Sequence, residues 1–166
     1  VKFASEGYIT VLAARSEENL RTTADLVGEA GGEYLVVRTD VTAENEVETL
    51  FRKAAKVGDL AVLAVNAGVG TFKAVEEITI EEWQAMLDVN LTGAFLCTRE
   101  AVKLMKKANA GHIIYINSLS GKRALSWGSG YSASKYGLRG LADTVRIELR
   151  KSNVKVTSVF PGSVDS

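Results

Sequence analysis

The chain has 166 residues, of which 46% are hydrophobic and 24% charged, and its twenty basic residues balance twenty acidic ones. A formal net charge of zero does not attract a nucleic-acid backbone or an anionic membrane surface, so we expect neither partner. No apolar run approaches the roughly 20 residues of a membrane span. The single cysteine, Cys97, and single histidine, His112, argue against a disulfide framework and a metal site. We expect one cytoplasmic domain over residues 1–166.

The chain contains five short apolar runs. They are too continuous for strands with one solvated face, so they predict a parallel sheet buried on both faces. The runs are Tyr8–Ala14, Tyr34–Val37, Leu60–Val65, Ile113–Ile116 and Val154–Phe160.

Helical periodicity fills the segments between these runs. Thr42 is a candidate N-cap for the second helix, and Thr79 begins a capping-box pattern that opens a long helix reaching about Lys107. Alternating strands and helices predict an α/β fold with a doubly wound parallel sheet in three layers. The apolar stripes are Leu20, Ala24 and Val27; then Val47, Leu50, Phe51 and Ala54; then Tyr131, Lys135, Leu138, Ala142, Val145 and Leu149.

A tyrosine and a lysine four residues apart carry the clearest chemical signal. On a helix, the hydroxyl of Tyr131 and the ammonium of Lys135 face the same way. A cation within about 4–6 Å favours the ionised form of a phenol and lowers its pKa, which makes the hydroxyl a usable proton donor and acceptor. The alternative is an amphipathic helix with a half-buried tyrosine and a solvated lysine.

Further motifs flank this pair in a characteristic order. Asn66-Ala67-Gly68 and Asn117-Ser118-Leu119-Ser120-Gly121 precede the Tyr131–Lys135 pair, and Pro161-Gly162 follows it. With this set, the chain resembles the short-chain dehydrogenase/reductase family over essentially all of its residues. The resemblance implies a Rossmann-type fold and a hydride transfer between a nicotinamide cofactor and a carbonyl or alcohol.

The resemblance also implies roles for single residues. Tyr131 matches the family's catalytic acid/base, and Lys135 matches the lysine that lowers the tyrosine pKa and binds the nicotinamide ribose. Ser118 matches the serine that polarises the substrate oxygen; Ser120 is a rival, but the thirteen-residue offset from the tyrosine favours Ser118. Asn90 matches an asparagine at a helix kink that orders a water and completes a proton relay.

The residues after the first apolar run bear on the choice of cofactor. Arg15 and Ser16 follow Ala14 with no carboxylate before Glu17. An arginine there accommodates a 2′-phosphate, so we expect NADP(H) rather than NAD(H). The alternative is that Arg15 is a solvated loop cation and Ser16 only caps the next helix.

Further candidate cofactor residues follow apolar runs, where ligands of doubly wound folds lie: Asp40-Val41, Asn66-Ala67-Gly68 and Pro161-Gly162. The contacts that they make are implied by the family. The adenine is expected at Asp40 and Val41, and the adenosine ribose above Asn66, Ala67 and Gly68. The nicotinamide end is expected at Pro161, Gly162, Val164 and Ser166.

We expect Leu119, Leu125 and Trp127 to line an apolar substrate pocket beside Ser118 and Tyr131. The predicted reaction is NADP(H)-dependent reduction of a ketone, aldehyde or 3-oxoacyl group, or oxidation of the matching alcohol. An NAD-dependent alcohol, steroid or sugar dehydrogenase of the same family and a non-catalytic NADP-binding sensor are the alternatives. By resemblance, the helices at 90–107 and 131–150 are association surfaces of a homodimer or homotetramer.

The family's glycine-rich phosphate-binding turn and its first strand are not found in the sequence. In the family's 3-2-1-4-5-6 order, that strand lies in the middle of the sheet. Because Val1 is not an initiator Met, we expect the domain to be truncated at both ends, with this strand preceding Val1 and the substrate-covering segment following Ser166.

Overall fold

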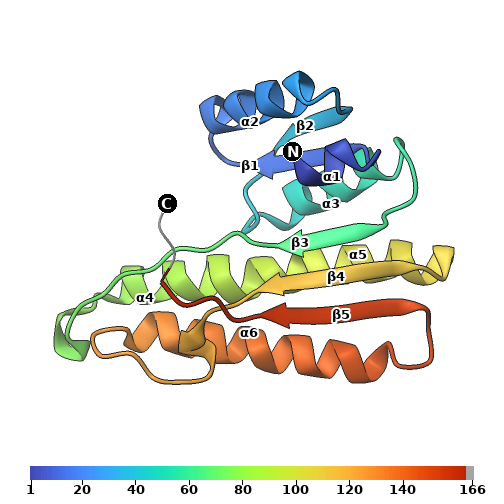
Figure 1. Ribbon diagram of the computed structural model, residues 1–166. Helices are drawn as coiled ribbons and strands as arrows, with labels where there is room; N and C mark the ends of the chain where they lie inside the picture. Colours follow the sequence, from blue (N-terminus) through green and yellow to red (C-terminus); the bar gives the residue numbers. More distant parts are fainter. Residues whose placement is uncertain (164–166) are drawn as a thin grey trace. The chain divides into compact units, whose positions relative to one another are not determined.

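The computed structural model describes residues 1–163, and parallel strands alternate with helices along it, which confirms the α/β fold (Figure 1). The chain divides into two compact units, Val1–Asp59 and Leu60–Ser166. Among the residues described, no helix combines the length and the hydropathy needed to cross a bilayer.

The first unit contains a two-stranded parallel sheet. Its strands pair from Thr10 opposite Tyr34 to Ala14 opposite Arg38, and α2 packs on both. The buried side chains of α2 are those of the predicted apolar stripe. The elements are α1 (Lys2–Ser5), β1 (Thr10–Ala14), α2 (Glu17–Glu29), β2 (Tyr34–Arg38) and α3 (Glu44–Ala54).

The prediction that Thr42 caps the helix now labelled α3 is wrong: the helix starts one residue later, and no side chain caps it. The N-cap of α3 is Ala43. The Thr42 hydroxyl instead donates to Asp40 Oδ1 at 2.8 Å, and the Thr42 backbone N–H donates to the same oxygen at 2.9 Å. Thr42 is therefore committed to a turn closed by an aspartate, a local motif that competes with helix capping.

The second unit contains a three-stranded parallel sheet in the order β3-β4-β5. The side chain of His112 in β4 is hydrogen-bonded to that of Thr157 in β5, with 2.8 Å between Nε2 and Oγ1, which links the two strands. The elements are β3 (Val62–Val65), η1 (Val75–Glu77), α4 (Ile80–Leu87), η2 (Asp88–Gly93), α5 (Ala94–Ala108), β4 (Gly111–Ile116), η3 (Leu119–Gly121), α6 (Ser129–Glu148) and β5 (Val154–Val159).

The long helical segment after Thr79 begins as predicted. Thr79 Oγ1 accepts from the Glu82 N–H, and the Glu82 side chain accepts from the Thr79 N–H, so the capping box is complete. The segment is not one regular helix, because η2 is a π-helical turn between α4 and α5. That turn contains Asn90 and is the kink implied by the resemblance.

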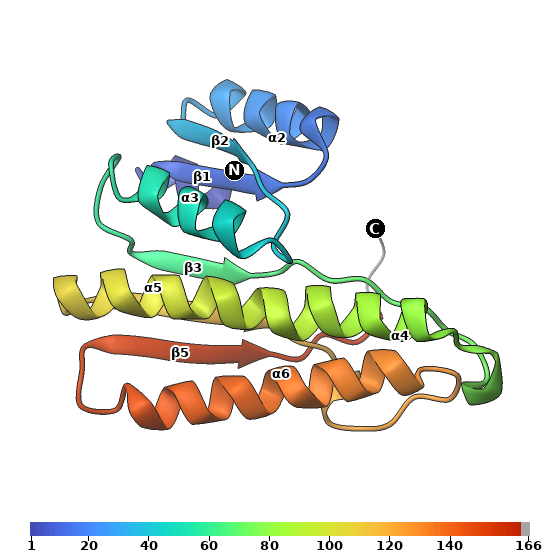
Figure 2. The same cartoon turned by 180° about the vertical axis from the view of Figure 1, so that it is seen from behind.

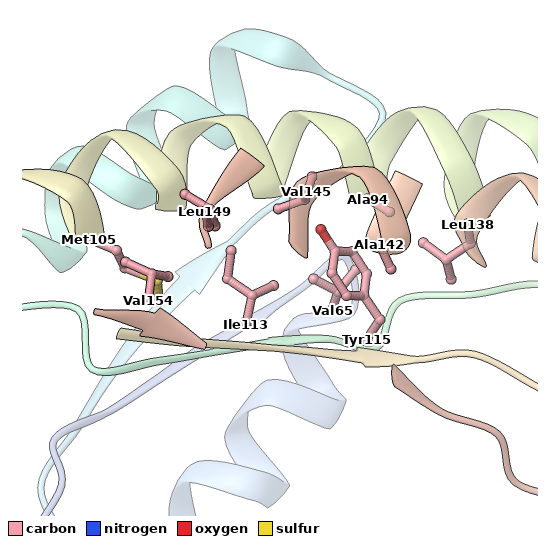
Figure 3. Close-up of a cluster of buried hydrophobic side chains, with 10 residues drawn as sticks. All are labelled: Val65, Ala94, Met105, Ile113, Tyr115, Leu138, Ala142, Val145, Leu149 and Val154. Atoms are coloured by element: carbon pink, nitrogen blue, oxygen red, sulfur yellow. The ribbon is translucent and has the colours of Figure 1, made fainter. Parts of the chain in front are cut away.

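The core of the second unit lies between α5, α6 and one face of the sheet (Figure 3). Ile113 and Tyr115 of β4 are fully buried on that face, whereas the residues of β4 that alternate with them are only half-buried. In the described residues, the face of β4 beside α5 and α6 is therefore the more deeply buried of the two. The reason is topological: two successive right-handed crossovers in the same direction place their helices on the same face.

Candidate active site

An open cavity of about 330 Å³ lies in the second unit, where the chain leaves β3 and β4. Four of the predicted site residues line it, namely Asn66, Gly68, Tyr131 and Lys135. The first turns of α6 supply the last two of these, and the loop after β3 supplies the first two. The rest of the lining consists of Val69, Gly70, Phe72, Ile116 and Asn117.

Tyr131 and Lys135 face one space, as their helical spacing predicts. The Lys135 Nζ lies 5.7 Å from the centroid of the Tyr131 ring and donates to the Ile116 carbonyl at 3.1 Å. The lysine is only 4% exposed, so the alternative of a solvated cation is wrong. Burial disfavours the charged form and lowers the pKa of Lys135.

Asn90 is buried behind this pair, and its side-chain amide joins two elements. Nδ2 donates to the Val69 carbonyl at 2.8 Å and to Ser134 Oγ at 2.9 Å, while Oδ1 accepts from the Val69 N–H at 2.8 Å. Ser134 Oγ in turn donates to the carbonyl of Tyr131 at 2.7 Å. The amide of Asn90 thus fastens the loop after β3 to the first turns of α6.

Ser118 lies beside the cavity lining without being part of it. Its hydroxyl accepts from the Ser120 N–H at 3.1 Å and caps η3. Ser118 is half-buried whereas Ser120 is buried, so Ser118 is the better placed of the two rivals to meet a ligand.

Asn117 and Phe72 line the cavity but were not predicted. Asn117 is buried; its Oδ1 accepts from the Ser118 N–H at 2.9 Å, and its Nδ2 donates to the Lys135 carbonyl at 3.2 Å. A Cβ on Gly121 would lie 2.6 Å from this Oδ1, so the segment passes close to the amide. An asparagine directly after an apolar strand was the available signal for Asn117. A lone loop phenylalanine gives no such signal.

The three residues expected in an apolar substrate pocket are exposed in the structure. Leu119, Leu125 and Trp127 have 48%, 48% and 69% of their surface exposed, and none of them lines the cavity. The Leu119 N–H donates to the Pro161 carbonyl at 3.0 Å, which joins the segment after β4 to the one after β5. Gly162 lies beside Leu119. Val164 and Ser166 are outside the described residues.

The cofactor residues predicted from β1 and β2 belong to the first unit. Arg15 is exposed, and Ser16 caps α2 by accepting from the Asn19 N–H at 3.2 Å, so the capping role named as an alternative is present. The pKa of Asp40 is lowered by the hydrogen bonds from Thr42 and, less strongly, by the charges of Arg15 and Arg38. Val41 is half-buried.

Cys97 is buried in α5, and burial raises the pKa of its thiol to about 11, which disfavours the reactive thiolate.

Comparison with known proteins identifies the family. The family model for short chain dehydrogenases matches residues 1–166. The chain is 33% identical to a 3beta-hydroxysteroid dehydrogenase from Mediterraneibacter gnavus, over all of this chain and 60% of that relative. Among solved structures, it resembles an actinorhodin polyketide ketoreductase variant with NADPH, with a TM-score of 0.95 and 34% identity over 99% of this chain and 64% of that one.

A metagenomic short-chain oxidoreductase in complex with NADP is also similar, with a TM-score of 0.92 and 36% identity over 98% of this chain and 74% of that one. The match runs the length of this chain, although the chain spans about three fifths of the steroid dehydrogenase. The chain belongs to the short-chain dehydrogenase family.

Proposed function

We propose that the protein is an NADP(H)-dependent oxidoreductase that transfers a hydride between the nicotinamide and a ketone, aldehyde or 3-oxoacyl group, or the matching alcohol. The observation that carries this proposal is that Tyr131 and the buried Lys135 line the same cavity. Asn90 is held behind them by hydrogen bonds. The ketoreductase and the metagenomic oxidoreductase, whose structures hold NADPH and NADP, support the choice of cofactor class.

The residues around the cavity fit the ribose end of a nicotinamide nucleotide. An ammonium has three donors, and among the described residues Lys135 uses one of them, on Ile116, so it retains donors for ribose hydroxyls. A Cβ on Gly68 would lie 3.3 Å from Asn90 Oδ1 and 3.7 Å from Lys135 Nζ. A side chain there would fill the space in front of the ammonium, so the glycine keeps that approach open.

When bound, the nicotinamide supplies or accepts the hydride. Tyr131 gives its phenolic proton to the carbonyl oxygen as negative charge develops there, or takes the proton of the alcohol in the reverse direction. Lys135 stabilises the phenolate that remains. Ser118 donates a hydrogen bond to the same substrate oxygen, and two donors aimed at the developing charge lower the barrier.

In the first unit we propose that Arg15 and Ser16 bind the 2′-phosphate of NADP(H), and that Asp40 and Val41 contact adenine. Titration of the protein with NADPH and NADH, followed by nicotinamide fluorescence, tests this. We expect NADPH to bind about tenfold or more tightly, because a bidentate arginine–phosphate pair is lost with NADH. Equal or tighter binding of NADH would instead support an NAD-dependent alcohol, steroid or sugar dehydrogenase.

For the other cofactor positions, we propose that Asn66, Ala67 and Gly68 pass beneath the adenosine ribose and that Pro161, Gly162, Val164 and Ser166 meet the nicotinamide end. We also propose that residues 1–166 belong to a single dinucleotide-binding domain. The resemblance to the family supports these assignments, and the described lining residues Asn66 and Gly68 agree with the first of them.

Replacing Tyr131 with phenylalanine tests the reaction itself. We expect Tyr131→Phe to lower kcat for a panel of ketones and aldehydes by about 10²–10⁴-fold, since the proton donor is removed. Binding of NADPH, measured by its fluorescence, should be retained and serves as the control for folding. Turnover that survives the change would remove Tyr131 from the mechanism. Wild-type protein that binds NADPH without reducing any carbonyl would instead be a sensor.

A further inference from the structure

The cavity wall contains an aromatic ring that the proposed reaction does not use. Phe72 lines the cavity, and 53% of its surface is exposed. Its ring packs against that of Tyr131, with 5.3 Å between centroids and 57° between ring planes. The two tilted rings form a corner in the cavity wall. We call this pair the aromatic corner.

The backbone holds Phe72 in this place from both sides. The Thr71 N–H donates to Met86 Sδ at 3.4 Å, and the Lys73 N–H donates to the Trp127 carbonyl at 2.8 Å. Met86 is buried, so the first anchor is part of the packed interior. The exposed ring is therefore carried by a loop that is fastened immediately before and after it.

Gly70 allows the two rings to meet. A Cβ at this position would lie 3.1 Å from Cε2 of Phe72 and 3.2 Å from Cδ2 of Tyr131. These separations are shorter than ordinary van der Waals contact, so a side chain at position 70 requires the rings to shift by a few tenths of an ångström. The aromatic corner thus depends on a glycine in the loop as well as on the two rings.

We propose that the aromatic corner binds a flat aromatic group next to the reacting carbonyl, so that aryl ketones and the matching aryl carbinols are preferred substrates. This inference rests on the proposed function. An aromatic group gains ring–ring attraction beyond the apolar area that it buries, whereas a saturated ring of similar size buries a comparable area without that gain. The half-exposed phenyl ring of Phe72, packed against the ring of Tyr131, offers such a contact to the substrate.

Acetophenone and cyclohexyl methyl ketone provide a matched pair of probes. The measured quantity is the ratio of their kcat/KM values with NADPH, compared between variants, so that the intrinsic reactivity of each ketone cancels. We expect Phe72→Leu to lower the ratio of acetophenone to cyclohexyl methyl ketone by about three- to tenfold. Phe72→Tyr keeps the ring and should keep the ratio.

Phe3→Leu is the matched control. Phe3 of α1 is also a half-exposed phenylalanine, with 46% of its surface exposed, and it packs on a tyrosine, Tyr8, at 5.8 Å between ring centroids, but it lies outside the cavity lining. Its loss should leave the ratio unchanged. Gly70→Ala, which keeps both rings but displaces them, should lower the ratio in the same direction as Phe72→Leu.

The outcomes separate this inference from the proposed function. An unchanged ratio in Phe72→Leu, an equal fall in Phe3→Leu, or turnover of other carbonyls but neither probe would overturn the aromatic corner and leave the oxidoreductase standing. Failure of the wild-type protein to reduce any carbonyl would overturn both. A fall confined to Phe72→Leu and Gly70→Ala supports the inference.

Discussion

Ser134 connects the buried Asn90 to the helix turn that carries Tyr131. It is fully buried, and its hydroxyl accepts from Asn90 Nδ2 while donating to the Tyr131 carbonyl. No part of Ser134 lines the cavity, so it acts through its neighbours. These contacts make Ser134 a positioning residue for Tyr131.

Removing this hydroxyl should affect turnover more than cofactor binding. In Ser134→Ala we expect kcat to fall by about three- to tenfold with the KM for NADPH unchanged, and the free energy of unfolding to fall by about 1–3 kcal/mol because an N–H of Asn90 loses its partner. Ser132→Ala is the control: Ser132 is also buried in α6 but accepts only a long bond, from the Leu125 N–H at 3.4 Å. Equal losses of kcat in both variants would mean that Ser134 contributes only to packing and does not position Tyr131.

At the scale of the element, the capping box at Thr79 gives α4 a pH-dependent contribution. The pKa of Glu82 is lowered by its hydrogen bond with Lys73 and by the Thr79 N–H. A carboxyl whose pKa is lower in the folded state stabilises the fold above its unfolded pKa of about 4.3, and this stabilisation is lost as pH falls through the folded pKa.

The variant Glu82→Gln should therefore be less stable than the wild type at pH 7 and nearly as stable as the wild type at low pH. Urea unfolding at pH 7 and at about pH 3.5 measures the difference between the two proteins. Glu77→Gln is the control, because Glu77 of η1 carries the same charge but, among the described residues, takes no part in the capping box and does not pair with Lys73. A difference that persists at the lower pH would mean that the carboxylate charge is not the source.

Local signals predicted the elements better than the long-range ones. The capping box at Thr79 and the apolar stripe of α2 are confirmed because both depend on residues within a few positions of one another. Thr42 was misjudged because Asp40 competes for its hydroxyl. The deeper burial of one face of β4 also escaped prediction, since apolar side chains alone do not reveal where two crossover helices pack.

The part of the site that could be predicted is the part that depends on helical spacing and on the ends of strands. Spacing placed Tyr131 and Lys135 together, and strand ends pointed to Asn66 and Gly68. Leu119, Leu125 and Trp127 are exposed outside the cavity because a loop's direction is set by tertiary hydrogen bonds, such as the one from Lys73 to the Trp127 carbonyl. The same loop geometry brings Phe72 to Tyr131, which no sequence period encodes.

At the scale of the whole molecule, we propose a homodimer or homotetramer assembled through α5 and α6. Both helices expose large apolar side chains, with Phe95 at 46%, Tyr136 at 44% and Ile147 at 64%. Apolar groups on an oligomer surface gain free energy when a second copy covers them. Both helices belong to the second unit, in which they also cover the core (Figures 2 and 3).

Sedimentation velocity tests this assembly. We expect the wild-type protein to sediment as a multiple of its chain mass and Ile147→Glu to shift it toward the monomer, because a carboxylate in an apolar contact must be desolvated. Leu26→Glu, at a 50% exposed leucine of α2, controls for the added charge. A wild-type monomer, or an equal shift in both variants, would refute association through these helices.

The close approach at Gly121 has a practical consequence for directed evolution. A Cβ there would lie 2.6 Å from Asn117 Oδ1 and 2.9 Å from the Lys135 carbonyl oxygen. These two residues are hydrogen-bonded to each other, so neither can easily move away. We expect most variants from a library randomised at position 121 to misfold. Degenerate codons are better placed at Phe72, whose ring can be exchanged on the open side of the cavity while position 121 stays invariant.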